Sequence, residues 1–149
     1  MSAGSEKSIF LADDDGDDCL LFEDALREIN LQTHLTTAND GLQLMEILDK
    51  TVPPPPDVIF LDLNMPCKNG FECLDEIKQS PKLRYIPVII FSTSAQPDTI
   101  NRVYQQGANY YICKPGSFPL LKKAIQYVLS IDWKEHAIQP PREKFVIQP

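Results

Sequence analysis

Residues 57–61 read DVIFL, a short run that is apolar at consecutive positions, and Asp62 follows it directly. A strand covered by helices on both faces has this pattern, as the central strands of parallel sheets do. The prolines at 53–56 before it cannot belong to a helix or to a central strand, so they form a stiff connector. The stretch therefore predicts a central parallel strand that ends at a carboxylate.

The same alternation of a short apolar run and a longer amphipathic one occurs five times along the chain. We expect strands over residues 8–12, 33–38, 57–61, 87–91 and 110–113. We expect helices over residues 17–29, 41–49, 70–79, 97–106 and 118–129. In the last helix we expect these residues to point inward: Leu120, Leu121, Ala124, Ile125 and Val128. Five strand-then-helix units predict an α/β fold, a doubly wound parallel sheet with helices on both faces.

The bulk composition limits the classes of function. A length of 149 residues suits one domain, which we place at 7–130 between a tail at 1–6 and an extension at 131–149 that Trp133 would anchor. The net charge of −7 argues against a nucleic-acid partner. No apolar run approaches the roughly 20 residues of a membrane span, and no signal peptide is recognisable, so we expect a cytoplasmic protein. The four cysteines form no C-x-x-C pair and are expected to be free thiols.

Polar side chains follow the expected strands, and those after the second strand, Asn39 and Asp40, are suited to cap the next helix. In open parallel sheets, ligands bind at the carboxyl ends of the strands. The other residues found there are Asp13, Asp14 and Asp15 after the first strand, Asp62 after the third, Ser92 and Thr93 after the fourth, and Lys114 after the fifth. We therefore expect carboxylates, a hydroxyl and an ammonium to meet on one rim.

This combination indicates phosphoryl chemistry with a metal ion. Carboxylates held close together repel one another unless a cation neutralises them, and Mg²⁺ prefers oxygen ligands. The ion would reduce the repulsion between Asp62 and an incoming phosphoryl group. Lys114 and Ser92 can bind phosphoryl oxygens, and a carboxylate such as Asp62 can act as the nucleophile.

Four blocks of the sequence carry a family resemblance. FLADDD (10–15), IFLDLNMPCKNG (59–70), IPVIIFSTSA (86–95) and YYICKP (110–115) resemble the signature blocks of response-regulator receiver domains. The resemblance covers about residues 7–130 and implies a flavodoxin-like (βα)5 fold with strand order 2-1-3-4-5. DDDGDD, LNMP and the proline-rich connector are most similar to single-domain, chemotaxis-regulator-like receivers that act as partners of bacterial phytochromes and hybrid kinases.

The resemblance implies a role for each site residue. Asp62 would be the phosphoacceptor, with Lys114 beside it and Ser92 as the switch hydroxyl. Mg²⁺ would be bound by Asp13, Asp14, Asp62 and the backbone carbonyl of Asn64, with Asp14 as a direct ligand. Tyr111 would be the switch aromatic, Asn64 and Ser94 would tune the lifetime of the phosphoryl group, and the Lys114–Pro115 bond would be cis.

Two positions allow a second interpretation. Thr93 would replace Ser92 as the switch hydroxyl if the strand register shifted by one residue, and Ser92 is preferred. Asp15 would extend the acidic pair, but capping of the following helix or exposure to solvent is the preferred interpretation.

The expected function is that of a stand-alone response regulator in a two-component phosphorelay, with Mg²⁺ as cofactor. A sensor histidine kinase or a histidine phosphotransfer protein would donate to Asp62. Ser92 would then move inward, Tyr111 would follow, and the altered surface would bind a kinase, a downstream protein or a second copy. The chain would catalyse only its own phosphorylation and dephosphorylation, and would bind neither nucleic acid nor membrane.

Two other functions remain open at this point. A degenerate receiver would be an interaction scaffold that is never phosphorylated. A phosphatase of the haloacid dehalogenase type would need a second acid where Asn64 stands, and usually a cap domain.

Overall fold

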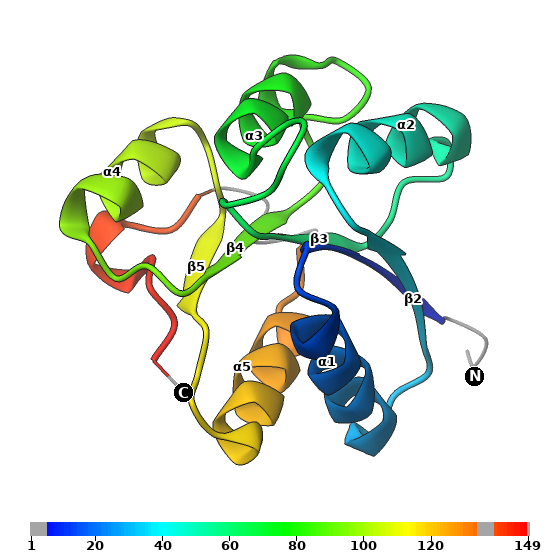
Figure 1. The fold of residues 1–149 in the computed structure, drawn as a ribbon, viewed down its shortest axis with the longest axis vertical. Helices are drawn as coiled ribbons and strands as arrows, with labels where there is room; N and C mark the ends of the chain where they lie inside the picture. Colours follow the sequence, from blue (N-terminus) through cyan, green and yellow to red (C-terminus); the bar gives the residue numbers. More distant parts are fainter. Residues whose placement is uncertain (1–5, 134–138, 149) are drawn as a thin grey trace.

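The computed structural model describes residues 6–133 and 139–148 (Figure 1). Its sheet contains β1 (Lys7–Ala12), β2 (Thr33–Ala38), β3 (Val58–Leu61), β4 (Val88–Ser92) and β5 (Tyr110–Cys113). All neighbouring strands are parallel, and their order is β2-β1-β3-β4-β5. The predicted fold class and strand order are therefore confirmed.

The helices cover both faces of this sheet (Figure 1). α1 (Gly16–Glu28) and α5 (Phe118–Ser130) lie on one face, and α2 (Gly41–Thr51), α3 (Gly70–Gln79) and α4 (Pro97–Gln105) lie on the other. Every expected element is present, with bounds that differ from the expected ones by two residues at most.

The apolar side chains form one hydrophobic cluster on each face of the sheet. Along β1, Phe10 and Ala12 join the cluster under α2, α3 and α4, whereas Ile9 and Leu11 join the cluster under α1 and α5. All four residues of β3 are buried, as expected for a central strand. Leu120 was predicted to point inward, and this prediction is wrong. Its exposed fraction is 39% because the buried face of α5 is centred on Leu121 and its neighbours one and two turns later.

Polar side chains fix the helix starts at the carboxyl end of the sheet. Asp15 caps α1 by accepting hydrogen bonds from the backbone of Asp17 and Asp18, which confirms the capping interpretation. A capping box between Asn69 and Glu72 begins α3. These caps fix the loops that follow β1 and β3.

Residues 139–148 lie along the outer edge of β5. The backbone N–H of Tyr111 donates to the Phe145 carbonyl at 3.1 Å, and that of Ile147 donates to the Tyr111 carbonyl at 2.9 Å. Tyr111 and Val146 form a parallel bridge, and Arg142–Lys144 form a 3₁₀ turn, η1. Phe145 is fully buried against the rings of Tyr104 and Tyr111. This C-terminal segment thus extends the sheet by one short pairing.

Trp133 contacts Tyr110 with a distance of 5.9 Å between ring centroids. The contact agrees with its expected role as an anchor, although residues 134–138 after it lie outside the described part of the chain. No helix within the described residues has the length and apolar character needed to cross a membrane.

Candidate functional site

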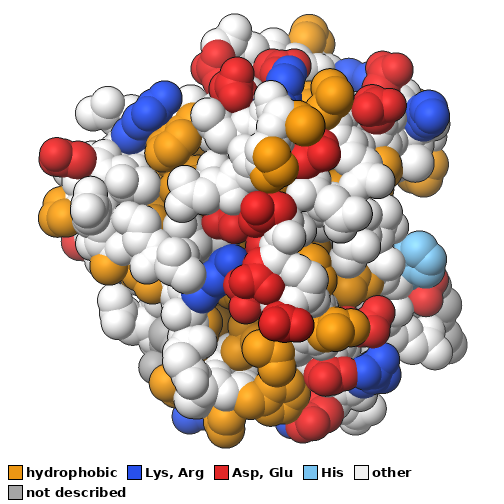
Figure 2. Space-filling model, in the orientation of Figure 1, with side chains coloured by type: hydrophobic (Ala, Val, Ile, Leu, Met, Phe, Trp, Pro, Cys, Tyr) orange, Lys and Arg blue, Asp and Glu red, His pale blue; other side chains and the backbone are white. Residues whose placement is uncertain are grey.

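Three acidic side chains meet where β1 and β3 end. Asp13 is fully buried, Asp62 is 6% exposed and Asp14 is exposed. One carboxylate oxygen from each of the three lies within 4.8 Å of the others. Figure 2 shows acidic side chains grouped near the middle of this face, beside a basic one. The expected acidic rim is therefore present.

The loop after β3 holds Asp62 tightly. Its backbone N–H donates to the Ala12 carbonyl at 2.9 Å, and its carboxylate accepts from the Leu63 N–H at 2.8 Å. A Cβ atom added at Gly70 would lie 2.2 Å from the Asp62 carbonyl oxygen, so only glycine fits this close approach. In the same loop Cys67 has a φ of 68°, in the left-handed region.

Lys114 brings the ammonium to the rim. Its backbone N–H donates to the Ser92 carbonyl at 2.8 Å, which fixes the end of β5 beside the end of β4. Its Nζ lies 2.7 Å from Asp18 Oδ2, 2.8 Å from Asp13 Oδ2 and 3.5 Å from Asp62 Oδ2. The predicted meeting of Lys114 and Asp62 is therefore confirmed.

The contact with Asp18 is new. Residues 13–18 read DDDGDD, so the sequence shows two further carboxylates after Gly16. Both also suit the first turn of a helix, so the sequence alone does not assign either of them to the site. Only the rotation of α1 relative to β5 decides which of the two reaches Lys114.

Burial and charge shift the pKa values of this site. Burial raises the pKa of Asp62 to about 6, the Lys114 charge opposes this shift, and the Asp13 charge adds to it. Burial lowers the pKa of Lys114, but the hydrogen bonds to Asp13 and Asp18, together with the negative charges of Asp62 and Asp13, outweigh burial, so its pKa lies above the ordinary value. Lys114 is therefore a stable cation at neutral pH.

The donor set fits a divalent cation. Asp13, Asp14 and Asp62 offer only carboxylate oxygens, which Mg²⁺ and Mn²⁺ prefer. One ammonium cannot neutralise these three acids together with Asp18. The Asp13 charge adds to the rise in the pKa of Asp62 that burial causes. The exposed Asp14 leaves the cluster open to solvent.

The hydroxyl and aromatic candidates lie beside the acidic rim. Ser92 is fully buried, whereas Thr93 is exposed, and this difference favours Ser92 as the residue that faces the site. Ser92 Oγ accepts from the Ser94 N–H at 3.2 Å. A hollow of about 160 Å³ next to them is bordered by Asn64, Ser92 and Ser94, among others.

Tyr111 is already buried. Its exposed fraction is 0%, its hydroxyl donates to the Ser94 carbonyl at 2.8 Å, and burial raises its pKa. The expected inward movement therefore has no outward starting position in this structure, where the ring lies in the hydrophobic core beside the Phe145 ring. Its role as the switch aromatic stays a prediction.

The Lys114–Pro115 bond was predicted to be cis, and this prediction is wrong. The bond is trans, and the cis bonds within the described residues precede Pro53 and Pro54 in the connector. The trans isomer of an X–Pro bond is intrinsically favoured by about 0.5–1 kcal/mol.

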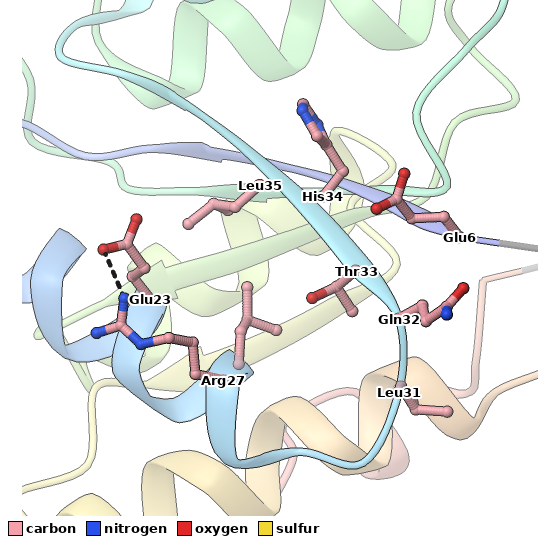
Figure 3. Close-up of a pocket in the computed structure, with 9 residues that line it drawn as sticks. Glu6, Glu23, Arg27, Leu31, Gln32, Thr33, His34 and Leu35 are labelled. Atoms are coloured by element: carbon pink, nitrogen blue, oxygen red, sulfur yellow. Dashed lines mark hydrogen bonds and ion pairs between the residues drawn. The ribbon is translucent and has the colours of Figure 1, made fainter.

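A larger hollow lies away from this rim. It measures about 770 Å³ and is lined by residues around the amino end of β2, including Gln32, Thr33 and His34 (Figure 3). Its charged residues Glu23 and Arg27 pair with each other at 3.3 Å. Since the hollow lies at the opposite end of the strands, the acidic rim remains the candidate site.

Comparison with known proteins identifies the family. The family model of the response regulator receiver domain matches residues 9–126. This chain belongs to the receiver domain family. Receiver domains act in two-component signalling, are phosphorylated by histidine kinases or phosphotransfer proteins, and bind Mg²⁺ or Mn²⁺ at an acidic pocket.

Response regulator Rcp1 from Synechocystis sp. is similar to this receiver domain along most of its length. The two are 35% identical over 138 residues, which cover 90% of this chain and 93% of Rcp1. The structure of Mn²⁺-bound Rcp1 gives a TM-score of 0.75 at 34% identity and covers 91% of this chain and 99% of that one. The phosphorylated cyanobacterial phytochrome response regulator RcpA gives a TM-score of 0.79 at 34% identity, covering 92% and 100%.

Proposed function

We propose that this receiver domain is a Mg²⁺-dependent switch that accepts a phosphoryl group on Asp62. The observation that supports this best is that residues at the ends of β1, β3 and β5 meet at one buried carboxylate. Asp62 lies within 4.8 Å of Asp13 and Asp14, and 3.5 Å from the Lys114 ammonium. In this proposal Asp13, Asp14, Asp62 and the Asn64 carbonyl hold the metal, which would supply positive charge for the phosphoryl oxygens.

The transfer needs one nucleophile and one leaving group. A carboxylate oxygen of Asp62 attacks the phosphorus of a phosphohistidine on a sensor kinase or phosphotransfer protein. The new O–P bond forms as the donor N–P bond breaks, and its electron pair stays on the imidazole. Lys114 neutralises charge on the phosphoryl oxygens, and Ser92 donates a hydrogen bond to one of them. Attack by water later releases phosphate and restores the Asp62 carboxylate.

The output in this proposal is a change of protein-binding surface. Movement of Ser92 toward the phosphoryl group alters the hydrogen bonds that link it to Ser94 and, through Ser94, to Tyr111. Asn64 and Ser94 border the adjoining hollow, which supports a role for them in the lifetime of the phosphoryl group.

The partners in this proposal are proteins of the cytoplasm. Similarity to Rcp1 and RcpA favours a phytochrome-type sensor kinase as the donor. The altered surface would bind that kinase, a downstream protein or a second copy of this chain. The net charge of −7 disfavours nucleic acid as the target.

Labelling with acetyl phosphate in the presence of Mg²⁺ tests the acceptor. The wild-type protein should gain one phosphoryl group by intact mass, and Asp62→Asn should gain none. Asp57→Asn is the matched control, because Asp57 lies just before the other end of β3 and is exposed. Labelling of Asp62→Asn at the wild-type level would exclude Asp62, and an unlabelled wild-type protein would favour an interaction scaffold.

A further inference from the structure

The ammonium of Lys114 is closer to Asp18 than to the acceptor. Its Nζ lies 2.7 Å from Asp18 Oδ2 and 3.5 Å from Asp62 Oδ2. Asp18 belongs to the first turn of α1, so a helix outside the strand-end loops contributes directly to the charge arrangement of the site.

The environment of this pair makes it more than a surface contact. The exposed fraction is 11% for the Lys114 side chain and 29% for that of Asp18. Exposed ion pairs contribute little, whereas partial removal of water strengthens the attraction. Asp18 is also outside the group formed by Asp13, Asp14 and Asp62, so its carboxylate is not committed to the expected metal site.

We propose that Asp18 is a positioning residue that holds the Lys114 ammonium on the α1 side of the site and competes with the phosphoryl group for it. This inference rests on Asp62 being the phosphoacceptor. Lys114 has three N–H donors, and three carboxylates already lie around its Nζ. A phosphoryl oxygen must displace one of them, and Asp18 is the most exposed of the three.

The effect is measured with beryllofluoride, a phosphoryl mimic, at saturating Mg²⁺. Asp18→Asn removes the competing charge and should tighten beryllofluoride binding about three- to fivefold in calorimetric titration, the range expected for one partly exposed ion pair. Asp18→Glu keeps a carboxylate and should bind within about twofold of the wild-type protein, since a charge-dependent role is rescued by the conservative variant.

Asp17→Asn is the matched control. It removes the same charge from the same turn of α1, but Asp17 is exposed and lies at the neighbouring position of the helix. Its effect on affinity measures the long-range charge alone and should stay below about twofold. In a Lys114→Met background, Asp18→Asn should change the affinity no more than Asp17→Asn does, because the ammonium that Asp18 holds is gone.

The results separate the two proposals. Equal affinity changes in Asp18→Asn and Asp17→Asn, or weaker binding by Asp18→Asn, would overturn the positioning role while labelling of Asp62 still stood. Persistent acetyl phosphate labelling of Asp62→Asn would overturn the acceptor assignment, and the positioning role with it. A threefold or larger gain that needs both Asp18 and Lys114 supports the inference.

Discussion

The thiols of this receiver domain differ in burial, and we therefore expect them to differ in reactivity. Cys67 is exposed in the loop after β3, whereas Cys73 is buried in α3 and its pKa is raised by that burial to about 12. Thiolates react with alkylating reagents, so access and a low pKa both matter. At pH 8, iodoacetamide should modify Cys67 at least about 100-fold faster than Cys73 in the folded protein.

Peptide mass mapping over time distinguishes the two sites. Cys67→Ser should remove the fast phase and leave the slow modification unchanged. Rapid modification of Cys73 in the folded protein would contradict the packing described here.

Gly70 permits the close approach that fixes the acceptor loop. A Cβ atom there would lie 2.2 Å from the Asp62 carbonyl oxygen and 2.7 Å from Leu63 Cα, both backbone atoms. Gly70→Ala should therefore lower the free energy of unfolding by about 3 kcal/mol, measured by urea denaturation. Gly16→Ala is the control, since a Cβ there meets nothing within 4 Å and alanine favours the helix. Similar stability of the two variants would be incompatible with this loop geometry.

At the level of elements, Lys78 connects α3 to the start of β4 and β5. Its Nζ donates to the Ile86 carbonyl and to Asn109 Oδ1, both at 3.0 Å. Burial lowers its pKa to about 8. Above that pH the folded state releases a proton that the unfolded chain retains, so this residue makes stability rise with pH until the ordinary lysine pKa of about 10.4 is reached.

The comparison with Lys78→Met isolates this contribution. Between pH 7.5 and 10, the free energy of unfolding of the wild-type protein should rise by about 1–2 kcal/mol relative to Lys78→Met. The control variant Lys50→Met, at an exposed position in α2, keeps Lys78, so its free energy of unfolding should rise with pH as that of the wild-type protein does. A constant difference between wild type and Lys78→Met across this range would show that the ammonium is hydrated in the folded state.

Local patterns predicted the elements well because each pattern has a local cause. The apolar runs of β3 and β4, and the helix start at Gly70, follow from burial and capping by nearby residues. The observed bounds differ from the expected ones by one or two residues at positions where the side chain suits both the helix or strand and the adjoining loop. The exposure of Leu120 depends on how α5 is rotated against the sheet, which its own sequence does not define.

The candidate site was predicted as far as strand ends determine it. Asp13, Asp62 and Lys114 meet because parallel strands place their carboxyl ends on one rim. Asp18 was missed because its contact depends on helix rotation. The contact of Tyr111 with Phe145 was missed because the two residues lie 34 positions apart in the chain.

At the level of the whole molecule, the C-terminal segment is part of the hydrophobic core. Phe145 is fully buried and its ring contacts Tyr104 and Tyr111 at centroid distances of 4.9 and 6.2 Å. Phe145→Ala should lower the free energy of unfolding by about 3–4 kcal/mol. Tyr85→Ala, at a site that is 72% exposed, should change it by no more than about 0.5 kcal/mol. If urea denaturation showed that Phe145→Ala changes the free energy of unfolding as little as Tyr85→Ala does, the C-terminal segment would be detached in solution.

The pairing of Val146 with Tyr111 makes the two margins of the sheet unequal. Beside β5, both backbone hydrogen-bonding groups of Tyr111 are already used by the chain's own terminus. Within the described residues, β2 is the outermost strand on the other margin, and no strand pairs beyond it. An extended peptide that joins this sheet by main-chain pairing must therefore add beside β2, or else first peel away residues 145–147 and expose an aromatic ring to water.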